Sequence, residues 1–232
     1  LAPRRPGEPW AVEAMISLRN GTVDGLALKA LQTITGVEGT VRLTEHALDI
    51  EALSGTILGS RWTVNGTLAP LAHPSIELFL QSRAALESLS GLVPAMKEAW
   101  RVVGLADIRV VVRGPLQPTP RFDYLIHADI RDATLSNPKL KAPITGVSGR
   151  VEYDAIERRL VISHLESRLL DQPMAVNGTV RLAAPVDVTL AIDGTLPIEV
   201  LTGWLPPEGP IQDIGGLAVL DVDLHGPLNA IS

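Results

Sequence analysis

The sequence predicts a mostly β protein, an elongated antiparallel sheet that is folded over and built from two tandem repeats, with short helices at its rim. Two observations lead to this fold class. Apolar and polar residues alternate through many short segments, which gives a strand one apolar and one polar face. A set of short motifs also occurs twice in the same order, which indicates an array of similar units.

The repeat is clearest in one eight-residue motif. Ile34–Val41 returns as Ile144–Val151 at an offset of 110, with six of eight positions identical, and Asn65–Thr67 returns as Asn177–Thr179 at an offset of 112. Three shorter motifs also recur: Gly91–Pro94 as Gly203–Pro206, Gly104–Leu105 as Gly216–Leu217, and Gly114–Leu116 as Gly226–Leu228. We therefore expect one continuous array with units at 11–122 and 123–232, and an edge or linker at 1–10.

Each unit is expected to run as hairpin, long strand, strand, short helix, strand and Gly-Pro turn. The first hairpin turn lies at Thr44–Ala47, and the longer Asp154–Arg159 replaces it in the second unit. Extra residues at an exposed hairpin tip cost little, which explains the change in offset. The order gives five or six strands per unit and some dozen in the chain, too many for a flat sheet, so we expect the sheet to coil or fold over.

The Asn-Gly pair of the second motif allows two interpretations. Asn-Gly is the usual type I′ hairpin turn. Gly66 and Gly178, however, stay in phase with the apolar residues on both sides, which favours one long strand with a bend, a bulge or a close backbone approach at the glycine.

Helical spacing is confined to one place per unit. Ser82–Trp100 carries apolar residues three and four apart, interrupted by Pro94, and Ile198–Leu205 is its shorter counterpart. We expect these helices to cover an exposed sheet face or edge.

Composition excludes several classes of function. The chain of 232 residues has no Cys, a net charge of -6 and scattered Lys and Arg, which argues against thiol chemistry and a nucleic-acid footprint. Hydrophobic residues make up 46% but aromatic residues only 3%. No segment approaches the roughly 18 apolar residues of a membrane-spanning helix. The chain is expected to be a piece of a longer protein.

Motifs for catalysis and metal binding are also missing. The five His are not at metal-ligand spacing. Carboxylates such as Asp221 and Asp223 fill the polar positions of strands, as alternation alone requires. Nucleophile elbows and phosphate-binding loops are absent. We expect no enzyme activity, no catalytic residue, no metal and no cofactor.

The apolar face itself remains as the candidate site. A long strand array with few aromatic residues and little helix must bury this face by folding over, against neighbouring repeats, or against a ligand. Acyl chains are a suitable occupant, because each buried CH₂ contributes roughly 0.8 kcal/mol. From parity, the lining residues are expected to be Val41, Leu43, Ile50, Trp62, Val64, Leu78, Val110, Val112, Val151, Ile162, Val176, Val180, Val188, Leu190, Ile192 and Val222.

A family resemblance rests on the succession of motifs. Gly104–Leu116, then 122–130, 133–135 and 143–151, then 160–162 and 176–180, is similar to the cadence of the AsmA-like superfamily. Leu196–Leu201 with Leu205-Pro206 resembles an element of its YhdP branch. The resemblance covers about residues 11–228.

The resemblance implies a segment of a repeating β-groove bridge. Such proteins are anchored in the inner membrane of diderm bacteria, cross the periplasm, and conduct phospholipid along an apolar interior toward the outer membrane. The anchor would lie outside this chain, and the partners would be phospholipid acyl chains, the two membranes and possible envelope proteins. Two alternatives stay open, a structural β-array with a sealed interior and a periplasmic scaffold for outer-membrane protein assembly that binds its partners at an exposed strand edge.

Overall fold

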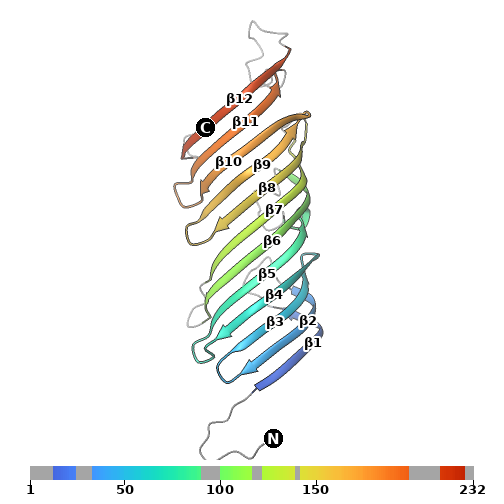
Figure 1. Ribbon diagram of the computed structural model, residues 1–232, viewed down its shortest axis with the longest axis vertical. Helices are drawn as coiled ribbons and strands as arrows, with labels where there is room; N and C mark the ends of the chain where they lie inside the picture. The colour runs from blue at the N-terminus through green and yellow to red at the C-terminus, as the bar shows by residue number, and fades with distance from the viewer. Residues whose placement is uncertain are drawn as a thin grey trace, which may run out of the picture. The chain divides into compact units, whose positions relative to one another are not determined.

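The computed structural model describes residues 13–24, 33–89, 100–116, 122–138, 142–198 and 215–227 (Figure 1). These parts of the chain form strands and a one-turn helix, α1 (Leu86–Leu89). The strands are β1 (Glu13–Asp24), β2 (Thr33–Thr44), β3 (Leu48–Ile57), β4 (Ser60–Ala69), β5 (Ser75–Ala85), β6 (Arg101–Pro115), β7 (Asp123–Ser136), β8 (Ile144–Asp154), β9 (Arg159–Leu169), β10 (Gln172–Arg181), β11 (Asp187–Pro197) and β12 (Leu217–Pro227).

The strands hydrogen-bond in sequence order from β1 to β12, in one antiparallel sheet that is not closed. The mostly β, antiparallel fold class is therefore confirmed, with six strands for each sequence repeat. Short connections explain the order, because antiparallel neighbours can be joined by tight turns whereas parallel strands need long crossovers.

Strand register repeats together with the sequence. Val41 lies opposite Ile50 between β2 and β3, and their counterparts Val151 and Ile162 lie opposite each other between β8 and β9. The other matching pairs are Leu43–Leu48 with Tyr153–Leu160, Leu18–Gly39 with Ile130–Gly149, and Gly21–Val37 with Ala133–Val147. The duplication thus extends to the pairing of individual residues.

Contacts divide the chain into two compact units. Among the described residues, the first contains β1 to β3, β4 from Arg61, β5 to Gln81, and β6 from Val110. The second contains Ser60 of β4, the remaining parts of β5 and β6, and β7 from Tyr124 to β12. The strands β5 and β6 thus contribute to both units, whereas the sequence repeat passes from one copy to the next before β7.

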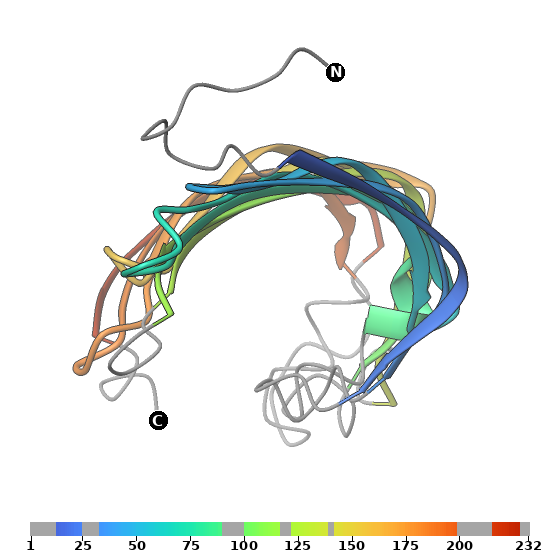
Figure 2. The ribbon, with the colours of Figure 1, turned by 90° about the horizontal axis from the view of Figure 1, so that it is seen from below.

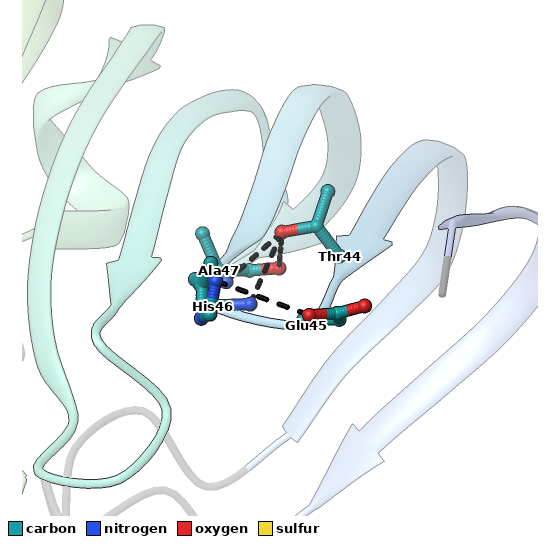
Figure 3. Close-up of polar contacts among 4 residues, drawn as sticks. All are labelled: Thr44, Glu45, His46 and Ala47. Carbon is teal, nitrogen blue, oxygen red and sulfur yellow. Dashed lines mark hydrogen bonds and ion pairs between the residues drawn. The ribbon is translucent and has the colours of Figure 1, made fainter. Parts of the chain in front are cut away.

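The predicted hairpin turn at Thr44–Ala47 is confirmed, and a single hydroxyl organises it (Figure 3). The Thr44 hydroxyl accepts hydrogen bonds from the backbone N–H of Ala47 at 3.0 Å and of His46 at 3.4 Å, and donates one to the Ala47 carbonyl at 3.1 Å. In the second unit the Asp154 carboxylate stabilises the corresponding turn, because it accepts hydrogen bonds from the backbone N–H groups of Ile156 and Glu157. Short polar side chains of this kind stabilise turns by bonding to nearby backbone.

Two-residue turns join β3 to β4 and β9 to β10. Leu58 and Gly59 have φ of 50° and 75°, and their counterparts Leu170 and Asp171 have φ of 51° and 63°. Positive φ at both central positions is the type I′ geometry, whose twist matches that of the flanking strands.

The two Asn-Gly pairs lie within strands β4 and β10, as the alternation predicted. A Cβ built on Gly66 would lie 2.1 Å from the Glu77 carbonyl oxygen, and one on Gly178 would lie 2.1 Å from the Thr189 carbonyl oxygen. Both glycines have φ near +150°, a region that glycine alone adopts readily. They allow a close backbone approach between neighbouring strands.

Among the described residues, three strands contain a non-glycine residue in the left-handed region where the ladder shifts register, namely Asn20 in β1, Asp132 in β7 and His164 in β9. These are β-bulges. Two of the bulges are secured from the next strand, because the Asp132 N–H donates to the Ser148 hydroxyl at 3.0 Å and the His164 N–H donates to the Asn177 side-chain oxygen at 2.7 Å.

The sequence predicts a helix that starts at Ser82, but in the structure the helix α1 starts only at Leu86. Ser82–Ala85 continue strand β5, where Ser82 and Ala84 are buried and Arg83 is exposed, so alternation extends further than expected. Only α1 follows, and 90–99 lie outside the described residues. The predicted helix at Ile198–Leu205 also lies outside them except for Ile198, which is helical.

Strands of both units bend along their length (Figure 2), so each unit has a concave and a convex face. Bulges and in-strand glycines are the usual devices for bending a sheet, and both occur here in mid-strand. No helix in the described part of the chain is long and apolar enough to cross a membrane.

Candidate functional site

Register places all eight predicted lining residues of the second repeat on one face. Residues directly opposite each other on antiparallel strands share a face. One row runs across the sheet from Val151 to Ile162, Gly178, Leu190 and Leu224. A parallel row joins Val176, Ile192 and Val222, and Val180 lies opposite Val188.

Polar contacts on the other face locate the lining residues of the first repeat. Arg61 donates to the Ser54 hydroxyl at 3.0 Å, which leaves its neighbour Trp62 on the opposite face. Arg113 pairs with Glu77 at 2.6 Å, which leaves its neighbour Val112 on the opposite, apolar face. By alternation, the apolar face of the first repeat contains Val41, Leu43, Ile50, Trp62, Val64, Leu78, Val110 and Val112.

This apolar face is only partly buried. Among the sixteen residues, Val41, Trp62 and Val188 are buried, and the other thirteen keep an intermediate exposure. Side chains buried to 0–1% exposure in the core are alanines, namely Ala84, Ala106 and Ala133. In the described regions, one sheet and a single helical turn are all the regular structure present, so no second layer of that structure covers this face.

We assign the apolar face to the concave side of each unit. Side chains converge on the inside of a bend and diverge on the outside, so the concave face should show lower exposure. In β6 the apolar-face residues Val102 and Ile108 are 8% and 6% exposed, whereas Val103 and Leu105 on the other face are 39% and 41% exposed. Strand bending therefore lines the inside of each unit with aliphatic side chains.

The convex face carries the charges, as cross-strand ion pairs. Arg42 pairs with Glu51 at 2.7 Å and Arg150 with Asp129 at 2.9 Å. A hydrogen bond to Asp129, together with its negative charge, raises the pKa of Arg150 above its usual value. Pairs this exposed contribute little to stability. Because these charged side chains must stay in water, they determine which face of the sheet is exposed to solvent and which face is apolar.

Trp62 carries an unusual polar atom on the apolar face. The side chain is 9% exposed, and its indole N–H finds no acceptor among the described residues. A buried donor without a partner costs roughly 1–3 kcal/mol. Because this N–H is itself buried, it is not presented to an occupant of the apolar face.

Sequence reasoning missed the lining residues that follow each bulge. Leu165 lies opposite Val176, and Ala133 opposite Val147, all on the apolar face. A bulge inserts one residue, so the residues beyond it change parity. The signal in the sequence is the change from even to odd apolar positions, as from Ile162 to Leu165 in β9.

A hollow of 480 Å³ in the second unit opens on the polar face rather than the apolar one. Its charged lining residues are Glu166, Arg168 and Asp193, which lie opposite Ala175 or Pro173 of β10 in register. Among the described residues, no group of three His, Cys, Asp or Glu is placed to hold a metal ion.

Comparison of the chain with protein-family models, curated proteins and solved structures finds no match.

Proposed function

We propose that this chain binds phospholipid acyl chains along its concave apolar face. The observation that carries the proposal is the aliphatic face of each unit, which the unit's own side chains leave partly open. Burial of apolar surface gives about 25 cal/mol per Å². A hydrocarbon chain lying across several strands therefore gains binding energy without specific polar contacts, while charged groups stay on the other face.

The lipid would slide along the face rather than occupy one pocket. Each strand offers a similar aliphatic row, so an acyl chain exchanges equivalent contacts as it moves from one strand to the next. The polar headgroup would remain at the open side of the concave face, in contact with water. We propose that the chain is a segment of a bridge that conducts phospholipid across the periplasm of a diderm bacterium, between an inner-membrane anchor and the outer membrane.

The test introduces a charge on each face at adjacent positions. Leu190→Asp places a carboxylate on the apolar face, and Thr189→Asp places one on the polar face of the same strand. Both proteins are purified gently from a Gram-negative host, checked for folding by circular dichroism, and weighed by native mass spectrometry with lipid extraction. Wild type and Thr189→Asp should retain phospholipid, and Leu190→Asp should retain several-fold less.

Two outcomes would contradict the proposal. A wild-type protein that carries no phospholipid and takes none from phosphatidylethanolamine–phosphatidylglycerol vesicles is a structural array. A folded Leu190→Asp variant with unchanged bound lipid places the lipid elsewhere.

A further inference from the structure

Both tyrosines of the chain meet at one end of the apolar face of the second unit. The sequence contains two Tyr in 232 residues. Tyr124 is the second residue of β7 and Tyr153 is the second-last residue of β8, so both lie where these strands end. Their ring centroids are 5.8 Å apart, with the ring planes tilted by 45°. Aromatic rings attract each other at this distance.

Register places both rings on the apolar face. Tyr153 lies opposite Ile126 of β7 and opposite Leu160 of β9. Tyr124 shares the face of Ile126 by alternation, and its carbonyl accepts a hydrogen bond from the Ala155 N–H at 3.0 Å. Diagonal neighbours on adjacent strands are within reach of aromatic side chains. The Tyr124 residue is 39% exposed, so the two rings stand where the aliphatic lining meets water.

The first repeat shows that packing does not require a tyrosine at this position. The counterpart of Tyr153 is Leu43, and the pair Leu43–Leu48 has the same register as Tyr153–Leu160. An aliphatic side chain therefore satisfies the same place in the fold. Tyrosine adds a hydroxyl group, and an apolar ring with a polar tip suits a boundary between apolar surface and water.

The turn after Tyr153 supplies a positive charge. The turn at Asp154–Arg159 is two residues longer than that of the first repeat, and Arg158 takes the place of His46. The Arg158 carbonyl accepts a hydrogen bond from the Leu182 N–H at 2.7 Å, which holds the turn against the next hairpin. Burial raises the pKa of Tyr153, and the charge of Arg158 acts in the opposite direction and lowers it in part. The Arg158 guanidinium therefore lies near the Tyr153 hydroxyl.

The carboxylates of this turn are already engaged. Asp154 accepts hydrogen bonds from two backbone N–H groups of the turn, and Glu157 pairs with Arg159 at 2.8 Å. Within the described ranges, no carboxylate lies within ion-pair distance of Arg158, which is exposed. Its guanidinium is therefore available to an anion.

The two phenols supply a neutral donor beside this charge. A hydrogen bond between Tyr153 and Tyr124 uses one of their two O–H groups and leaves the other for a ligand. A guanidinium binds phosphate oxygens through its planar set of N–H groups, and a phenol can donate to a phosphate or ester oxygen. Aliphatic surface begins directly beside them. This combination matches a group that is anionic at one end and hydrocarbon at the other.

We propose that Tyr124, Tyr153 and Arg158 form a rim site for the phosphate of a phospholipid whose acyl chain lies on the adjoining apolar face of the second unit. The rim site rests on the proposed function and deepens it, because it adds a preference for lipids that carry a phosphate. A lipid that slides along the face would be held longest at this point, since the first repeat has Leu43 and His46 in the equivalent places.

Two lipids that differ only in the headgroup test the rim site. Isothermal titration calorimetry compares dihexanoylphosphatidylglycerol with dihexanoylglycerol, both as monomers below their aggregation concentrations. Wild type should bind the phospholipid about three- to tenfold more tightly. Arg158→Gln and the double variant Tyr124→Phe/Tyr153→Phe should each lower this preference at least about twofold and leave the affinity for dihexanoylglycerol unchanged.

Arg168→Gln is the matched control. It removes the same charge at the far end of β9, on the polar face, and should keep the full preference. All variants are first checked for folding by circular dichroism. A loss of preference in Arg168→Gln equal to that in Arg158→Gln would assign the effect to net charge and overturn the rim site.

The remaining outcomes separate the rim site from acyl binding. A wild-type protein that binds both lipids equally overturns the rim site and leaves the proposed acyl binding intact, whereas one that binds neither lipid overturns both. Glycerol 3-phosphate, which has no acyl chain, should displace dihexanoylphosphatidylglycerol only at far higher concentration. Displacement at concentrations comparable to those of the phospholipid would identify a site for free phosphate and overturn the assignment to a lipid.

Discussion

Gly178→Ala tests the close approach between strands β10 and β11. The Cβ of alanine would lie 2.1 Å from the Thr189 carbonyl oxygen and 2.8 Å from the Cα of Leu190. Both contacts are with backbone of the neighbouring strand, which cannot retreat without breaking ladder hydrogen bonds. The φ of +147° is itself strained for any L-residue.

The expected loss of stability follows from these two effects. Backbone strain at such a φ costs about 1–3 kcal/mol, and overpacking against a well-packed neighbour typically costs a further 1–3 kcal/mol. We expect Gly178→Ala to lower the free energy of unfolding by about 2–6 kcal/mol. Gly146→Ala is the matched control, since Gly146 has a φ of +63° but nothing within 4 Å of an added Cβ. Its cost should be about 1–2 kcal/mol, the left-handed penalty alone.

Urea unfolding followed by far-ultraviolet circular dichroism measures both variants against wild type. Equal slopes with a lower midpoint for Gly178→Ala than for Gly146→Ala would agree with the expectation. A Gly178→Ala variant no less stable than Gly146→Ala would refute the argument, because the steric contact would then contribute nothing.

Three further predictions concern a turn, a bulge and a phenol. Leu170→Asn should raise the free energy of unfolding by about 0.5–1 kcal/mol, and with it the urea midpoint, because Asn adopts the φ of 51° more readily than Leu, which is 41% exposed here; a lower midpoint would contradict this. Asn177→Ala should cost about 1–2 kcal/mol in the same assay, because the His164 N–H loses its acceptor; no loss would show that the bond is dispensable. Burial raises the pKa of Tyr153 above 10.0, so the folded state favours the neutral phenol, and stability should be full below pH 10 and fall as the pH rises above it; Tyr153→Phe should remove part of that fall, and an identical pH profile would contradict the assignment.

The fold class was predictable because alternation and repetition are both direct consequences of the structure. Side chains of a strand alternate between its two faces because of backbone geometry. The face on which Val176 and Val180 lie can therefore be predicted from the sequence alone. The duplicated motifs mark the sites where geometry demands glycine, such as Gly66 and Gly178. The sequence therefore shows both the faces and the bends.

The limits of the predicted helix show where local signals compete. Ala84 and Ala85 favour helix intrinsically, and Leu86 and Leu89 have helical spacing, yet Ser82 and Ala84 are buried as part of β5. Neighbouring strands supply hydrogen bonds and packing that outweigh the propensity of two alanines. That tertiary contribution cannot be read from a local pattern.

Bulges escaped prediction for a different reason. Asn20, Asp132 and His164 adopt positive φ without being glycine, and side chains of neighbouring strands secure two of them. Such a bond joins residues sixteen or thirteen positions apart, so a local pattern does not report it. The parity change beyond each bulge moved residues such as Leu165 onto the apolar face unnoticed.

Photo-cross-linking tests the central claim most directly. A diazirine side chain is placed at Val176 on the apolar face or at Thr179 on the polar face of the same strand, and each protein is illuminated after incubation with phosphatidylethanolamine–phosphatidylglycerol vesicles that carry a labelled phospholipid. Binding of acyl chains to the concave face predicts strong labelling from position 176 and little from position 179. Equal labelling from both positions, or none from position 176, would contradict it.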